Sequence, residues 1–89
     1  MSHETWVSLR AREVVDQAGV QLTALLRGHT TGQWSDLKGR TVMVHGQRLS
    51  ACIVGRQVLW LWTEGDDSVI VALMEEVSRA SLQRGRSTN

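Results

Sequence analysis

The sequence contains no proline, phenylalanine or tyrosine, and its ten basic residues include a single lysine, Lys38. Its only cysteine, Cys52, excludes an internal disulfide bond and is typical of a chain that works in a reducing compartment. No apolar run approaches the roughly 20 residues that a membrane-spanning helix needs. The first residues also lack the basic segment and apolar run of a signal peptide. We therefore expect a cytoplasmic protein without a membrane association.

The length and the charge of the chain further narrow the class of protein. A chain of 89 residues is long enough for one hydrophobic core and too short for two. Hydrophobic residues make up 42% and charged residues 21%, which is typical of a folded domain and not of a disordered chain. The formal net charge of +1 argues against a protein built around the binding of polyanions.

The N-terminal part of the chain, residues 5–27, is predicted to form one long amphipathic helix. Apolar side chains recur there at steps of three and four residues, which places them on one stripe. The stripe consists of Val7, Ala11, Val14, Ala18, Leu22 and Leu25. Thr5 or Ser2 is placed to cap the start, and Gly28 is placed to end the helix in the left-handed conformation. Gly19 within the stripe is expected to let the sheet approach closely.

The second half of the chain has the two-residue alternation of β-strands. It follows a polar, glycine-containing loop over 29–40. The predicted strands are 41–44, 48–54, 57–64 and 68–74. A short helix is predicted over 75–84, and 85–89 is expected to be a flexible tail, so that the single domain spans 1–84.

Two turns set the predicted pairing of these strands. Gly55 opens a two-residue hairpin turn, which pairs Leu49 with Trp62. The loop over 64–67 is expected to pair Trp62 with Val69. The predicted fold class is therefore α+β: a long N-terminal helix packed on a three- to four-stranded antiparallel meander, with a short C-terminal helix.

This pairing predicts two sheet faces of different character. The face predicted to lie under the long helix consists of Leu49, Ala51, Ile53, Val58, Trp60, Trp62, Val69, Val71 and Leu73. The second face consists of Ser50, Cys52, Val54, Leu59, Leu61, Thr63, Ser68, Ile70, Ala72 and Met74. Because the second face is too apolar to lie in water, we expect it to be covered by the C-terminal helix or to form a homodimer interface.

The tryptophans are the only aromatic residues. Trp60 and Trp62 are predicted to be core residues, although an exposed pair on a strand would also suit the stacking of nucleic-acid bases. Trp6 is predicted to pack near the start of the long helix. Trp34 lies in the polar loop, where the pattern predicts no core role for it.

Few residues point to catalysis. His29 and His45 are candidates for a general acid–base pair assisted by Arg48 or Lys38, but a helix end and a turn account for both histidines more simply. Cys52 is predicted to be a buried, inert thiol, because it lies in the middle of a strand.

Metal and cofactor sites are not indicated. The acidic loop of Glu64, Asp66 and Asp67 has the composition of a turn and is much shorter than a calcium-binding loop. The glycines are isolated and form no phosphate-binding loop. We therefore expect no metal and no cofactor.

Three segments, over 29–36, 46–51 and 61–69, resemble a family of small proteins carried on bacterial plasmids and other mobile elements. Its pattern is H-x-x-G-x-W-x-D, then R-L-L-S-A, then W-I-I-T-E-x-D-x-S-V, ending near P-E-E-Y. The likeness covers residues 29 to 76; it departs in a shorter middle segment, in Trp62 for isoleucine and in Met74 for proline. The resemblance implies no particular activity. The positions that it marks are His29, Trp34, Asp36, Arg48, Ser50, Thr63, Glu64, Asp67 and Ser68.

These observations favour a non-enzymatic interaction protein of a mobile genetic element that binds a protein partner, in counter-defence or in regulation, or binds itself as a homodimer. The candidate binding residues are His29, Trp34, Asp36, Arg48, Glu64 and Asp67. One alternative is a nucleic-acid-binding module that uses Trp34 and the arginines. Another is a small metal-free nuclease that uses His29 and His45.

Overall fold

The computed structural model describes residues 4–65 and 67–77. These residues form two helices and five strands, with a further helical turn over 74–77. In chain order the elements are β1 (Thr5–Val7), α1 (Leu9–Ala18), α2 (Leu22–Thr31), β2 (Lys38–Val44), β3 (Gln47–Val54), β4 (Gln57–Thr63) and β5 (Val69–Leu73).

The strands form one mixed sheet in the order β1-β5-β4-β3-β2. Strands β2 to β5 pair antiparallel with their neighbours in the chain, and β1 adds to β5 in parallel. The predicted α+β class is confirmed, whereas the purely antiparallel meander is wrong. Residues Thr5–Val7 are extended and pair with β5. Ser8 caps the start of α1, because its Oγ accepts a hydrogen bond from Ala11 N at 3.1 Å, so the helix begins after this residue.

The predicted single helix over 5–27 is also wrong, because the chain breaks at Gly19. This glycine has a φ of 71° and caps α1, its N–H donating to Asp16 O at 3.2 Å. No atom lies within 4 Å of the position that a Cβ on Gly19 would take, so the glycine serves the turn and not a close approach to the sheet. The second helix continues through Gly28 and ends at Gly32, which has a φ of 77°. The apolar spacing runs across the break because both helices bury a stripe on the same sheet.

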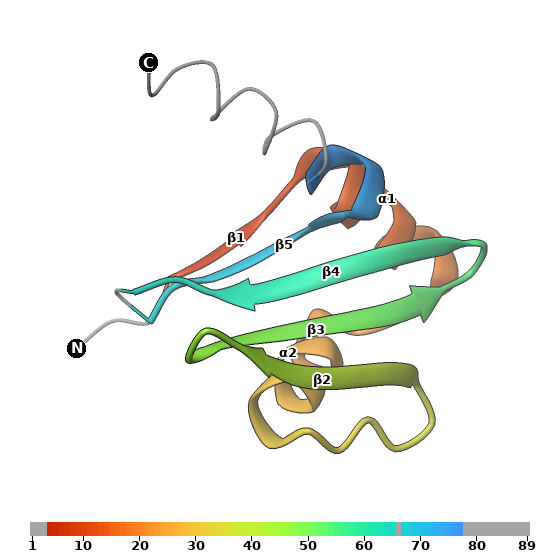
Figure 1. Cartoon of the computed structure of the whole chain (residues 1–89). Coiled ribbons are helices and arrows are strands. Elements are labelled where there is room, and N and C mark those ends of the chain that lie inside the picture. Colours follow the sequence, from red (N-terminus) through yellow and green to blue (C-terminus); the bar gives the residue numbers. More distant parts are fainter. Residues whose placement is uncertain (1–3, 66, 78–89) are drawn as a thin grey trace, which may run out of the picture.

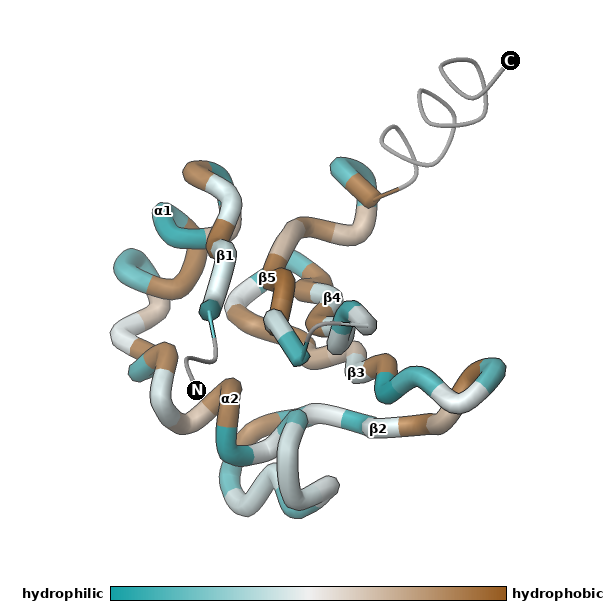
Figure 2. The backbone as a smooth tube through the Cα atoms, turned by 90° about the vertical axis from the view of Figure 1, so that its left-hand side faces the viewer, coloured by the Kyte–Doolittle hydropathy of each residue, from teal (hydrophilic) through white to brown (hydrophobic). Residues whose placement is uncertain are grey.

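Both helices lie on one face of the sheet, and the other face is turned toward the viewer in Figure 1. Figure 2 shows the same layers from the side. The buried core between helices and sheet consists of Ala11, Val15, Leu25, Trp34, Cys52, Val54, Leu59, Leu61, Val71 and Leu73.

In β3 and β4, the helices therefore cover the second of the two predicted faces. The predicted β3–β4 pairing is confirmed, with Leu49 opposite Trp62 and Gly55 in the turn at a φ of 62°. The β4–β5 pairing is one residue off, because Trp62 lies opposite Ile70 and not Val69. This shift places Val69, Val71 and Leu73 on the same face as Leu59 and Leu61, so these three β5 residues lie under the helices as predicted, whereas the residues of β3 and β4 are exchanged between the faces.

Two consequences correct the sequence-based expectations. Trp60 and Trp62 do not lie in the core under the helices but on the uncovered face, and Trp6 joins them there from β1 instead of packing at a helix start. A homodimer interface cannot lie on the face of Cys52 and Leu59, because the helices bury both residues.

The helical turn over 74–77 is attached to the start of α1. Ser8 Oγ donates to Glu76 Oε1 at 2.6 Å, and Leu73 N donates to the same oxygen at 3.0 Å. Arg10 Nη2 lies 2.8 Å from Glu75 Oε1. Most of the predicted C-terminal helix and the whole predicted tail lie outside the described residues. Neither helix within 4–65 and 67–77 has the length and apolar character needed to cross a membrane.

Candidate functional site

A chain of hydrogen bonds between polar side chains crosses the interface between α2 and the sheet. Trp34 Nε1 donates to Thr41 Oγ1 at 3.0 Å, and Thr41 Oγ1 lies 2.8 Å from Ser50 Oγ. The ring of His29 then joins Ser50 to Thr63, with Nδ1 2.6 Å from Ser50 Oγ and Nε2 2.8 Å from Thr63 Oγ1. We call these five residues the polar chain. Every buried side-chain nitrogen and oxygen in the described part of the molecule has a partner.

Two glycines make room for the first member of the polar chain. The Trp34 indole lies between Gly28 of α2 and Gly39 of β2 and is only 7% exposed. A Cβ on Gly28 would lie 2.3 Å from Trp34 Cε3, and one on Gly39 would lie 2.2 Å from Trp34 Cδ2. Trp34 is therefore a core residue that fastens the 33–37 loop, which the strand and helix patterns could not show. Its indole has almost no exposed surface on which a base could stack.

One order of donors that fits the polar chain starts from its tryptophan end. The Trp34 N–H can only donate, so the Thr41 hydroxyl accepts it and is free to donate to Ser50. If Thr41 donates to Ser50, Ser50 donates to His29 Nδ1, and the His29 proton lies on Nε2 and is donated to Thr63 Oγ1. In this arrangement each donor of the first four residues has an acceptor within the chain, and the Thr63 hydroxyl keeps its own hydrogen for a further partner.

Burial favours the neutral form of His29. The side chain is 1% exposed, and burial lowers its pKa below the usual range, with the charge of Arg48 adding to the shift. Arg48 Nη1 donates to the His29 carbonyl oxygen at 3.3 Å and to the Thr30 carbonyl oxygen, so it caps the end of α2.

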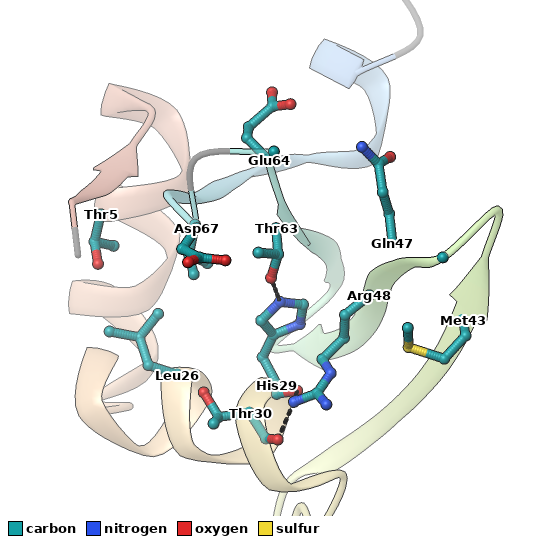
Figure 3. A pocket seen from close by; sticks show the side chains of 13 residues that line it. Thr5, Leu26, His29, Thr30, Met43, Gln47, Arg48, Thr63, Glu64 and Asp67 are labelled. Atoms are coloured by element: carbon teal, nitrogen blue, oxygen red, sulfur yellow. Dashed lines mark hydrogen bonds between the residues drawn. The ribbon is translucent and has the colours of Figure 1, made fainter.

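The polar chain ends at the wall of an open cavity of about 760 Å³ at one end of the sheet (Figure 3). Four of the six candidate binding residues help to line it: His29, Arg48, Glu64 and Asp67. Trp34 reaches it only through the hydrogen bonds of the polar chain. Asp36 lies on an exposed turn and is not among the lining residues.

The structure does not bring the two proposed acid–base histidines together at this cavity. His45 lies on the exposed β2–β3 turn with a φ of 51° and is not a lining residue. Cys52 is buried, which confirms that part of its prediction, and burial raises the pKa of its thiol. Within the described residues, no three His, Cys, Asp or Glu side chains gather into a group that could hold a metal ion.

Thr41 is the member of the polar chain that the sequence did not single out. Ser50 and Thr63 were marked by the family resemblance alone. The signal that points to Thr41 is its position two residues after Gly39, which places both on the helix-facing side of β2.

The opposite side of the sheet carries a continuous apolar surface, which we call the open face. It consists of Trp6, Val42, Val44, Leu49, Ala51, Ile53, Val58, Trp60, Trp62, Ile70 and Ala72. Trp6 is 60% exposed and Ile53 is 52% exposed. Neither α1 nor α2 lies on this side of the sheet (Figures 1 and 2), and of the eleven residues only Ala72 is buried, at 7% exposure.

The open face offers contact area and almost no hydrogen-bonding capacity. The one polar group of Trp62, its Nε1, already donates to Glu64 Oε1 at 3.1 Å. Trp6 and Trp60 each add one indole N–H donor, and the remaining groups are aliphatic or aromatic carbon. Trp60 and Trp62 are partly shielded by their neighbours. Such a surface can bind by burial and by shape, and it cannot perform acid–base or nucleophilic chemistry.

Comparisons with known protein families, with curated proteins and with solved structures return no match for this chain.

Proposed function

We propose that this protein is a small, non-enzymatic interaction protein that uses its open face to bind a protein partner. The observation that carries the proposal is the open face itself. An uncovered apolar patch larger than several hundred Å² is rare on a monomeric protein and usually marks an interface. Three tryptophans lie on it, and tryptophan is enriched among the residues that dominate binding energy at protein interfaces.

The properties of the polar chain support a framework role for it. Both ring nitrogens of His29 are engaged by hydroxyl groups, and the ring is almost fully buried. A substrate would have to displace Thr63 to reach Nε2. The hydrogen bonds join α2 to β2, β3 and β4, so they stabilise the scaffold that presents the open face.

The resemblance to the mobile-element family extends the proposal. A partner encoded by the host or by the element itself would suit a small binding protein in counter-defence or regulation. The chemistry of the open face predicts what that partner offers: an apolar surface of similar size, because the open face supplies few polar partners of its own.

The test compares two matched substitutions. Ile53→Asp places a charge in the open face, and Leu9→Asp places the same charge on an exposed leucine of α1, which is 76% exposed and lies outside that face. Both variants should fold, because neither native side chain is buried. Crosslinking in the native host, followed by rebinding with purified components, should give a complex with the wild type and with Leu9→Asp and none with Ile53→Asp. Equal complex formation by all three proteins would refute the proposal.

A further inference from the structure

We infer that the partner of the open face is a second copy of this chain, packed face to face with its strands crossing those of the first copy nearly at right angles. This inference rests on the proposed function and names its occupant. It is carried by the distribution of charge around the open face, which is complementary to itself.

The strand register arranges the open face as rows. One row runs across all five strands, from Trp6 in β1 to Val42 in β2. The next row ends at Arg40, beside Ala51, and the row beyond it ends at Lys38, beside Ile53. On the other side of the first row, Glu4 precedes Trp6 by two residues and Glu64 follows Trp62 by two.

The two signs of charge lie along two adjacent edges of the face. Glu4 and Glu64 lie along the edge at the beginning of β1 and the end of β4, while Lys38 and Arg40 lie along the outer strand β2. These two edges meet at Val44. The acidic edge is about 19 Å long, from strands about 4.8 Å apart, and the basic edge is about 20 Å long, from a rise of about 3.4 Å per residue. The face is therefore nearly square.

A square face with opposite charges on adjacent edges is complementary to a second copy of itself that is related by a twofold axis along the diagonal of the square. A twofold axis through the Val44 corner exchanges the two edges, so it places Glu4 over Lys38 of the second copy and Glu64 near its Arg40. The same operation places Trp6 over Ile53, the two large apolar side chains of the face that are most exposed. Because the contact is symmetric, each pair forms twice.

Other twofold arrangements leave these charges unmatched. An axis along the strands would place Glu4 over Val44, and an axis across the strands would place it over another part of β1. The diagonal axis turns the strands by about 90°, which is one of the two preferred ways in which sheets pack face to face. The two faces together bury on the order of 1,000 Å², the lower limit for a specific interface. A reversible dimer is therefore expected.

Charge reversal tests the pairing with variants of the full chain. One variant carries Lys38→Glu and Arg40→Glu, and the other carries Glu4→Lys and Glu64→Lys. Each alone brings like charges together, and its dimer should dissociate about 100-fold more readily than the wild type, since like charges juxtaposed across an interface cost several kcal/mol. An equimolar mixture should form a heterodimer of wild-type stability, because both contacts become complementary again. Sedimentation velocity over a dilution series measures all four samples.

The outcomes separate this inference from the proposed function. A wild-type dimer that neither variant weakens, or a mixture that stays monomeric, overturns the diagonal arrangement. If the wild type is monomeric, the alkylation rate of an Ile53→Cys variant decides the rest, with buried Cys52 as the slow internal reference. Fast alkylation of this cysteine refutes only the self-association, because the face is then accessible and can still bind a different protein. A slow rate at every dilution means that the chain covers its own face, and both proposals fail. If the wild type is a dimer, as we expect, the alkylation rate of Ile53→Cys should instead rise on dilution, because the dimer then dissociates.

Discussion

The two faces of this sheet are both apolar, yet they differ in shape and in polar content. The covered face carries aliphatic side chains with small residues such as Gly39, Thr41 and Ser50, and the helices approach it closely. The open face carries the bulky indoles of Trp60 and Trp62. The comparison teaches that helices select a face by how closely they can pack on it, since apolar character is available on both sides.

The two faces also treat polar groups differently. The covered face buries a histidine, a serine and an indole N–H, and each finds a partner in the polar chain. The open face keeps its charges at the edges, where water or another protein can reach them. Buried polarity specifies one packing of α2 on the sheet, and edge charge specifies an orientation for a partner.

The largest predicted difference between the faces is in the free energy of unfolding that is lost when a side chain is truncated to alanine. Leu61→Ala on the covered face should lower the free energy of unfolding by about 2–5 kcal/mol, because it removes a fully buried side chain and leaves a cavity. Ile53→Ala on the open face should cost less than about 1 kcal/mol when the chain is dilute, since half of that side chain is already in water. Urea unfolding at one fixed protein concentration measures both. Equal losses would mean that the open face is covered after all.

A smaller effect is expected where Trp34 enters the covered side. Gly39→Ala should cost about 1–3 kcal/mol, because the new methyl group would overlap the indole. Gly65→Ala is the control, since no atom lies within 4 Å of its Cβ position. Thermal unfolding should separate the two variants clearly. A neutral Gly39→Ala would show that the indole does not occupy this slot.

A third predicted effect is a loss of stability at acidic pH. Because burial and Arg48 lower the pKa of His29 in the folded chain, the unfolded chain takes up a proton at a higher pH. Stability should therefore fall as the pH drops below about 6.5, the usual value for histidine. The fall should be weaker in His29→Gln, which does not titrate. Urea midpoints between pH 5 and pH 8 test this, and parallel pH curves for the two proteins would contradict it.

The smallest effect is expected away from both faces, at the exposed ion pair of Arg10 and Glu75. A double-mutant cycle with Arg10→Ala and Glu75→Ala should give a coupling energy below about 1 kcal/mol, because water and salt screen the pair. A larger value would mean that this contact, and not Ser8 and Glu76, fixes the turn over 74–77 on α1.

The candidate site divides in the same way between what the sequence predicts and what it does not. Four candidate residues line the cavity because the turns after β2 and β4 and the end of α2 reach the same end of the sheet. The sequence predicts no core role for Trp34, which is wrong, because the slot that buries its indole forms only when Gly28 of α2 and Gly39 of β2 are brought to either side of it. Asp36 and His45 are polar residues of the same kinds, but both lie on exposed turns and neither lines the cavity.

The sequence by itself determined the α+β class, the positions of the main strands, and the β3–β4 register through the turn at Gly55. These follow from local alternation and from the backbone freedom of glycine. Only the tertiary structure decided the break at Gly19, the parallel strand β1, the β4–β5 register and the face that the helices cover. The physical reason is that the alternation in β4 is between Leu59 and Leu61 on one side and Trp60 and Trp62 on the other. A pattern that is apolar on both sides cannot say which side is the core until helices of a given shape pack against it.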